Sequence, residues 1–124
     1  MPHLRLEYSG NIQMTRDHLK VLFSRLHEVL VDKADAELSR CQGRSACCEN
    51  FYVGDGAENR AFVYLQVLLL QGRSTGQLEE TGNALLKVLQ EEFKDLLVHY
   101  NAQISVHLNE VLKERSFKLN FVPS

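Results

Sequence analysis

Tryptophan is absent from the 124-residue sequence, and cysteine and proline are scarce, with three and two residues. The cysteines, Cys41, Cys47 and Cys48, are odd in number and define no disulfide framework, as is typical of a reducing compartment. Neither they nor the five histidines show the CxxC or HxxxH spacing that lets two side chains converge on one metal ion. We therefore expect neither a structural disulfide nor a metal site.

An excess of one charge and long hydrophobic runs are also lacking. The net charge is −2, and no basic stripe with interleaved aromatic residues is available to a phosphate backbone. The longest apolar run, AFVYLQVLLL at 61–70, has about half the length of a membrane span, and the N-terminus lacks a signal-peptide pattern. We expect a cytoplasmic protein with neither a nucleic-acid nor a membrane partner.

One of the two prolines directly follows the initiator methionine, at the head of a segment that alternates like a β-strand. In MPHLRLEYSG, the apolar residues Leu4, Leu6 and Tyr8 occupy every second position. A proline is tolerated at the first position of a strand because an N–H can be spared there, and this is the commoner explanation. Alternatively, removal of Met1 would make Pro2 a secondary amine at the chain's end, and such an amine can act as a base.

The rest of the chain shows the same order of elements in two halves. Apolar residues at steps of three and four predict a helix from about Thr15 to about Val31, capped by Thr15 or Asn11, and a second helix from a capping Ser74 to about Val98. Further strands are predicted in the last half of RSACCENFYV (44–53), in RAFVYLQVLLL (60–70) and at 102–109. Turn residues in VGDGAEN predict a chain reversal between the halves, and FKLNF near the end alternates again.

A strand–helix–strand order that occurs twice predicts one α/β (α+β) domain over residues 1–124. We expect a duplicated βαβ unit with right-handed crossovers, with halves 1–54 and 60–110 and a C-terminal tail at 111–124. These elements form a four-stranded mixed sheet with two helices on one face. The strand at 60–70 is apolar on both faces, so we expect another copy of the chain to cover the second face.

Motifs along nearly the whole chain resemble those of the 5-carboxymethyl-2-hydroxymuconate isomerase family of the tautomerase superfamily. They occur in the family's order and spacing: Pro2-His3, Glu7, Asn11-Ile12, Leu22-Phe23, Asp55-Gly56, Ala61-Phe62-Val63, Gly72-Arg73-Ser74 and Phe117-Lys118-Leu119-Asn120. The resemblance implies a tautomerase-like fold, a homotrimer whose sheets form the inner wall, and no metal or organic cofactor. It also implies an isomerase that shifts a double bond in a small unsaturated keto or enol carboxylate, with Pro2 as general base.

Such a base must be uncharged to accept a proton. An α-amino group has a pKa near about 8, and a proline amine is more basic, so burial or neighbouring positive charge must lower its pKa. The resemblance also places a substrate-binding arginine at Arg73, between a strand end and a helix start, where backbone N–H groups favour an anion. From the residues alone, Arg73 is a solvated loop arginine that contributes little to folding.

The family carries an Arg-x-Arg pair at the start of the second strand, and the corresponding residues here are Gln42 and Arg44. Glutamine keeps a hydrogen-bond donor but loses the charge, so we expect Arg44 to bind substrate and Gln42 to weaken the binding of dicarboxylates or tricarboxylates relative to the family norm. Phe51 and Tyr52 are candidates for the pocket wall, although strand aromatics more often belong to a core. Two alternatives stay open: a tautomerase of another substrate class, acting by phenylpyruvate-type tautomerisation or hydration, and a trimeric binding or structural protein without turnover.

Overall fold

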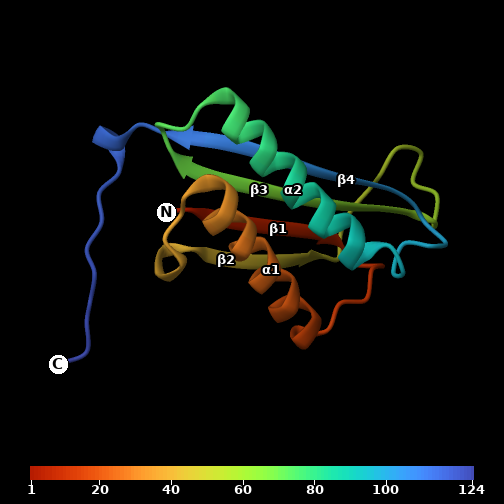
Figure 1. The fold of residues 1–124 in the computed structure, drawn as a ribbon. Coiled ribbons are helices and arrows are strands. Elements are labelled where there is room, and N and C mark those ends of the chain that lie inside the picture. Colours follow the sequence, from red (N-terminus) through yellow and green to blue (C-terminus); the bar gives the residue numbers. More distant parts are fainter.

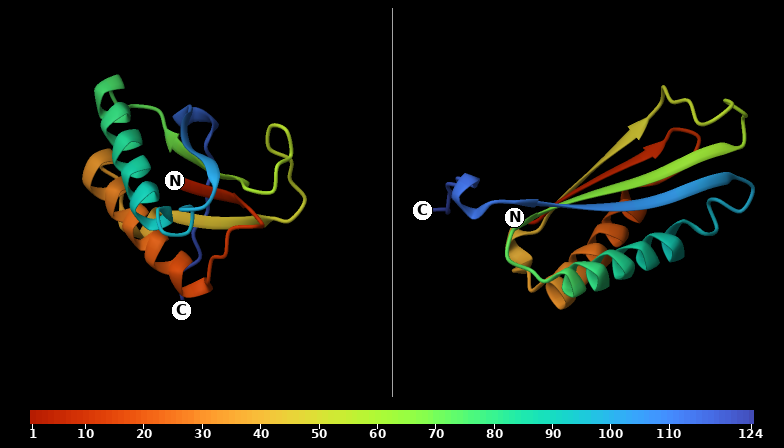
Figure 2. Two further views of the ribbon diagram at one scale, coloured as in Figure 1. Left: turned by 90° about the vertical axis from the view of Figure 1, so that its right-hand side faces the viewer. Right: turned by 90° about the horizontal axis from the view of Figure 1, so that it is seen from above.

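The computed structural model describes residues 1–124 and contains four strands, two long helices and two short 3₁₀ helices. In chain order these are β1 (His3–Ser9), α1 (Arg16–Ala34), η1 (Leu38–Arg40), β2 (Gln42–Cys48), β3 (Arg60–Leu70), α2 (Thr75–Phe93), β4 (Asn101–Val111) and η2 (Lys113–Arg115). Both long helices cover the same face of one sheet, and the other face is open (Figures 1 and 2). The predicted duplicated βαβ unit is confirmed. No helix is long and apolar enough to cross a membrane.

The strand order β2-β1-β3-β4 places the first strand inside the sheet. β1 is parallel to β2, β3 is parallel to β4, and the central strands β1 and β3 are antiparallel. The chain does reverse between β2 and β3, but β3 pairs with β1 instead of β2. The start of β1, the start of β2 and the end of β3 therefore meet at one end of the sheet, where His3 pairs with both Gln42 and Leu68. We call this end, around Pro2, Gln42 and Leu70, the proline end.

The helices begin where their capping residues predict. The hydroxyl of Thr15 accepts from the N–H of His18 at 3.1 Å, and that of Ser74 accepts from the N–H of Gln77 at 3.1 Å. The second helix ends at Phe93 and not near Val98; residues 94–99 form turns, in which Leu96 and Leu97 still pack against the core. The helical period in the sequence thus continued beyond the regular helix.

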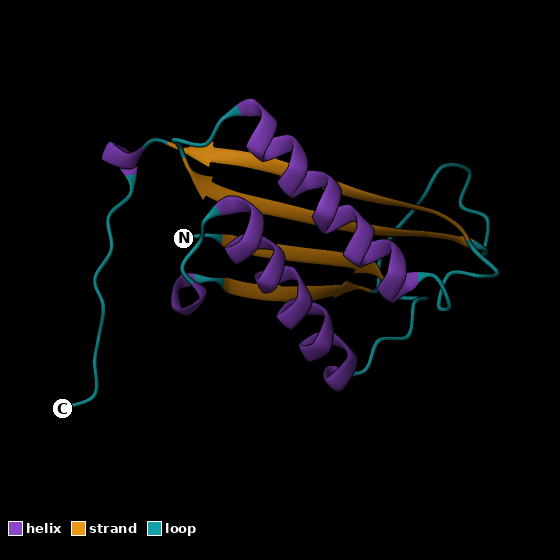
Figure 3. Cartoon of the chain, viewed as in Figure 1, coloured by secondary structure: helices purple, strands orange, loops and turns teal.

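β2 begins and ends earlier than predicted. The sequence placed a strand in the last half of RSACCENFYV, whereas β2 spans Gln42–Cys48 and residues 49–53 follow it as a loop. The reason is the pairing partner: β1 ends at Ser9, opposite Cys48, so residues beyond Cys48 have no strand beside them. The tail after η2 is likewise drawn as loop (Figure 3), and its alternating FKLNF segment has no neighbouring strand in this chain.

One hydrophobic core lies between the sheet and the two helices. The alternation predicted for β1 is confirmed, since Leu4, Leu6 and Tyr8 are buried. In β3, the residues on the helix side are all buried: Ala61, Val63, Leu65, Val67 and Leu69. Each fully buried leucine contributes about 1.5–3 kcal/mol relative to an exposed one. The remaining β3 side chains lie on the open face and are only partly buried in a single chain.

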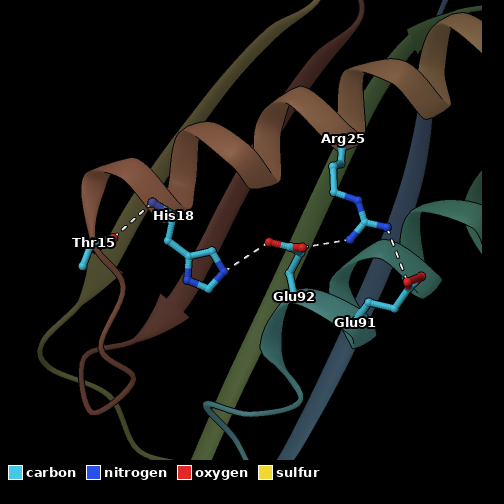
Figure 4. Close-up of polar contacts among 5 residues, drawn as sticks. All are labelled: Thr15, His18, Arg25, Glu91 and Glu92. Carbon is cyan, nitrogen blue, oxygen red and sulfur yellow. Dashed lines mark hydrogen bonds and ion pairs between the residues drawn. The ribbon is translucent and has the colours of Figure 1, made fainter.

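A polar cluster links the two helices at the surface (Figure 4). The carboxylate of Glu92 on α2 accepts from Arg25 Nη1 at 2.8 Å and lies 3.2 Å from His18 Nε2, both on α1. Arg25 also approaches Glu91 at 3.5 Å. The Glu92 side chain is only 16% exposed. Its charge-assisted contacts are therefore less screened by water than those of an ordinary surface pair, and they orient α2 relative to α1.

Gly43 allows α1 to pack closely on β2, and this gives the first prediction. A Cβ at position 43 would lie 2.5 Å from the Phe23 ring and 3.2 Å from His27 Nε2. We expect Gly43→Ala to displace that ring and lower the free energy of unfolding by about 1–3 kcal/mol, as measured by urea denaturation.

Gly82→Ala is the matched control. Gly82 lies within α2, and a Cβ there would make an ordinary 3.5 Å contact with the side chain of Leu108. Alanine in a helix interior is favoured over glycine by about 0.5–1 kcal/mol, so this variant should be as stable as the parent or more so. Equal destabilisation of both variants would show that the Phe23 contact is not the cause.

Candidate active site

Pro2 is buried at the proline end, immediately before β1. Its carbonyl accepts a hydrogen bond from the N–H of Gln42 at 3.1 Å. This bond joins the beginnings of β1 and β2, so position 42 stays beside the N-terminus of the chain. The structure thereby brings together Pro2 and Gln42, which are 40 positions apart in the sequence.

A pocket of about 270 Å³ opens beside the N-terminus. Its wall combines the N-terminus, the end of η1, the start of β2 and the C-terminal tail, and includes His3, Arg40, Gln42 and Phe117–Asn120. Figure 1 shows the tail running past the end of the sheet where the chain starts. Sequence reasoning identified Gln42 but not Arg40 and Lys118 as residues near the N-terminus; the FKLN motif was the available signal for Lys118. A larger groove of about 630 Å³, between α2 and β4, contains none of the predicted site residues.

The pocket favours the uncharged form of an amine at the N-terminus. Burial lowers the pKa of the Met1 α-amino group, and the positive charges of Lys118 and Arg40 lower it further, while Cys41 acts in the opposite direction. Arg40 forms an ion pair with Glu37 at 3.2 Å, so part of its charge is neutralised. Lys118 forms no ion pair or side-chain hydrogen bond within the chain.

Arg44 lies on the open face, next to the pocket. Its Nη2 donates to His3 Nδ1 at 2.9 Å, which requires that nitrogen to be unprotonated. Burial, then Arg44 and the N-terminal charge, lower the pKa of His3, so its ring is neutral at neutral pH. Arg44 forms no ion pair with a carboxylate, and with Arg5, Gln66 and His3 it lines a second pocket of about 300 Å³. His3 is thus shared by both pockets.

Arg73 lies at the proline end but on the side of the helices. Its Nε donates to the carbonyl of Ala34 at 2.6 Å and its Nη1 to that of Leu70 at 2.9 Å. These bonds join the C-terminus of α1 to the end of β3. They also satisfy two carbonyl groups that, at the end of a helix or strand, would otherwise lack a hydrogen-bond donor. These contacts argue against the expectation that Arg73 contributes little to folding. Its contact with a substrate stays a prediction. Only the N–H groups of Arg73 that do not bind these carbonyls could make that contact.

Phe51 and Tyr52 lie at the opposite end of the sheet from Pro2. The ring of Phe51 packs edge-on against Phe62, with centroids 6.2 Å apart, and the hydroxyl of Tyr52 donates to the carbonyl of Asp55 at 3.2 Å. Because β1 and β2 are parallel, residues after β2 are about 20 Å, the length of a seven-residue strand, from those before β1. Within one chain these aromatics do not line the pocket at Pro2, and their predicted role requires a neighbouring subunit.

The contacts of Arg73 give the second prediction. Arg73→Ala should lower the free energy of unfolding by about 1.5–3 kcal/mol, because two backbone carbonyls lose a charged donor. Thermal or urea denaturation measures the loss. The control is Arg115→Ala, at an exposed arginine of η2, which should change the free energy of unfolding by no more than about 0.5 kcal/mol. Unchanged stability in Arg73→Ala would contradict the structural role. The kcat/KM of the folded variant tests the substrate contact separately.

Comparison with known proteins places this geometry in a family. The profile of the 5-carboxymethyl-2-hydroxymuconate isomerase family matches residues 2–123. The 5-carboxymethyl-2-hydroxymuconate Delta-isomerase of Escherichia coli is 25% identical over 122 residues, which cover 98% of this chain and 96% of that protein. The crystal structure of a 5-carboxymethyl-2-hydroxymuconate isomerase from Deinococcus radiodurans R1 has a TM-score of 0.86 at 29% identity, covering 97% of this chain and 90% of that chain. A fused 4-OT wild type symmetric trimer shares the fold, with a TM-score of 0.77 at 16% identity over 97% of this chain and 94% of that one. The chain therefore has the tautomerase fold and belongs to the 5-carboxymethyl-2-hydroxymuconate isomerase family.

Proposed function

We propose that this isomerase uses Pro2, exposed as an N-terminal amine by removal of Met1, as the general base that shifts a double bond in a small unsaturated keto or enol carboxylate. The observation that carries the proposal is a buried proline at the head of the central strand, beside a pocket that contains Arg40 and Lys118. The family match, which begins at residue 2, supports it.

The environment of the N-terminus suits a base that works near neutral pH. The burial and the two cations that lower the pKa of the Met1 amine would act in the same direction on a Pro2 amine one residue further along. Uncharged Pro2 accepts a proton from a carbon next to the carbonyl of the substrate and returns it to another carbon of the conjugated system. The base is regenerated in each turnover, so the reaction consumes no other reagent.

The substrate carboxylate requires a cation, and Arg44 is our candidate. Its hydrogen bond to a neutral His3 orients the guanidinium without neutralising its charge. Gln42 faces the pocket at the N-terminus and can donate a hydrogen bond to the same substrate. A tautomerase of another substrate class would use the same base, so the substrate specificity depends on the cations around it.

We also propose that the protein is a homotrimer. The open face of β3 leaves Phe62, Tyr64, Leu68 and Leu70 only partly buried, and in the tail Phe117 and Phe121 are 90% and 93% exposed. So much exposed apolar surface on a small chain is typical of an interface. Similar folds occur in proteins named as trimers. In a trimer, Phe51 and Tyr52 of one subunit gain a neighbouring pocket that they can line.

The third prediction concerns the base. The intact mass of the native protein should lack Met1, and Pro2→Ala should lower kcat/KM for 5-carboxymethyl-2-hydroxymuconate about 10²- to 10⁴-fold, because the positioned secondary amine is lost. Ultraviolet absorbance follows the shift of the conjugated double bonds. Pro123→Ala, at the other proline, is the control and should retain full activity.

Two results would contradict this role of Pro2: a native protein that retains Met1 and still turns over, or undiminished kcat/KM in Pro2→Ala. A protein that has lost Met1 and yet turns over no unsaturated keto or enol acid would support the alternative of a binding or structural protein without catalysis.

The fourth prediction is the assembly. Sedimentation equilibrium at micromolar concentration should give three times the mass of the chain, because three sheets can cover one another's open faces. Leu68→Glu places a charge on the open face of β3 and should shift the mass towards the monomer, whereas Leu86→Glu, on a partly exposed site of α2, should not. A stable, well-folded monomer of the parent chain would rule out the trimer.

A further inference from the structure

The C-terminal tail contributes to the same pocket as the N-terminus, and nothing in the motif comparison gave its charge a role. The tail leaves the sheet through η2 and runs beside the start of the chain (Figures 1 and 2). Phe117, Lys118, Leu119 and Asn120 form part of the wall of the pocket at Met1, together with Arg40 and Gln42. Segments from the beginning, the first third and the end of the sequence therefore surround one cavity.

Lys118 is the unpaired cation of this cavity. Arg40 is held by Glu37 at 3.2 Å, and Arg73 is bound to two backbone carbonyls on the helix side. Lys118 has neither an acidic partner nor a hydrogen bond within the chain. Lys118 is exposed in the single chain, where water solvates its ammonium group, so this group can bind an anion in the cavity together with the second positive side chain, Arg40.

The position of Gln42 makes this cation necessary. Position 42 lies in the pocket beside Pro2 and carries no charge, although the resemblance to the family calls for an arginine there. A substrate with two carboxylates needs a second positive group in addition to Arg44, and Gln42 cannot supply it. Lys118 lies in the wall of the same pocket as Gln42, so a charge from the tail can take the place of the missing one.

We propose that Lys118, assisted by Arg40, binds the second carboxylate of a dicarboxylate substrate beside Pro2, and so takes over the charge that Gln42 lacks. This inference rests on the proposed function, since it assumes that the reaction occurs at this pocket. It reverses the expectation that Gln42 weakens dicarboxylate binding: the chain prefers dicarboxylates over matched monocarboxylates through its tail. The apolar neighbours Phe117 and Leu119, 90% and 80% exposed in one chain, become covered by the adjacent subunit and hold the tail in place.

Lys118 has a second effect, on the base. The groups that face the N-terminal amine are His3 on β1, Arg40 on η1, Cys41 before β2, and Lys118 on the tail. Of these, Lys118 and Arg40 lower the pKa of the amine by their positive charge. Removing the charge of Lys118 therefore raises the pKa of the base, and the acid limb of the profile of kcat/KM against pH moves to higher pH.

The test, our fifth prediction, compares Lys118→Met, which keeps the apolar stem, with the conservative Lys118→Arg. Isothermal titration calorimetry measures the binding of adipate, an unreactive six-carbon dicarboxylate, and of hexanoate, its monocarboxylate counterpart. We expect Lys118→Met to weaken adipate binding about ten- to a hundredfold and to leave hexanoate binding unchanged, because one charge-assisted contact is lost. Lys118→Arg should retain adipate binding, and Gln42→Arg should restore it in the Lys118→Met protein.

Lys113→Met is the control, because this lysine lies outside the pocket, on η2 beside Gln71, Glu110 and Glu114. It should change neither binding nor the pH profile. Unchanged adipate binding in Lys118→Met, or an equal loss for adipate and hexanoate, would overturn the inference. Its failure is distinguishable from that of the proposed function: an inactive Pro2→Ala with unaffected adipate binding in Lys118→Met refutes only the role of the tail. An active Pro2→Ala with lost adipate binding in Lys118→Met refutes only the base.

Discussion

The pairing of β1 on both of its edges is the interaction on which the rest of the structure depends. β1 is the first element of the chain, yet it lies inside the sheet, parallel to β2 and antiparallel to β3. This arrangement buries Leu4 and Leu6 under the helices and brings the N-terminus, the start of β2 and the end of β3 to one end of the sheet. A proline in front of an edge strand would be exposed to water, whereas Pro2 in front of this central strand is buried.

The positive side chains around this end differ in their partners. The partner indicates whether a side chain stabilises the fold or is available to a ligand. Arg73 donates to backbone carbonyls at the ends of α1 and β3, and Arg40 is paired with Glu37. Arg44 contacts a neutral histidine, and Lys118 contacts no acid at all. Both side chains are exposed in the single chain and neither is held by an acidic group, so each can bind an anionic ligand at the cavity beside it.

The two faces of the sheet also differ in what completes them. The helix side forms a closed core within one chain, whereas the open side and the tail keep apolar groups in contact with water. The proposed trimer removes this surface from water and at the same time brings the loop containing Phe51 and Tyr52 to another subunit. Assembly and the completion of the active site are then driven by the same apolar residues of the open face and the tail.

Local patterns in the sequence determined most of the fold. The period of two in β1, the continuous apolar run of β3, the period of three to four in the helices, and the cap at Ser74 depend on neighbours along the chain, so they could be predicted. The limits of β2 could not, because they depend on where β1 ends. The resemblance identified Pro2, Gln42 and Arg44 as candidates together with Arg73, Phe51 and Tyr52, and the strand pairing places the first three near one end of the sheet.

Tertiary structure alone decided the positions and contacts of the other candidate residues. Arg73 looked like a loop residue because its acceptors, the carbonyls of Ala34 and Leu70, come into reach only after α1 and β3 have packed. Phe51 and Tyr52 looked like pocket residues, but the parallel pairing of β1 and β2 carries them to the far end. Arg40 and Lys118 gave no sign of acting together, since 78 positions separate them. What the sequence by itself determined was local periodicity and motif identity; which distant charges share a cavity depends on long-range packing, which no local pattern encodes.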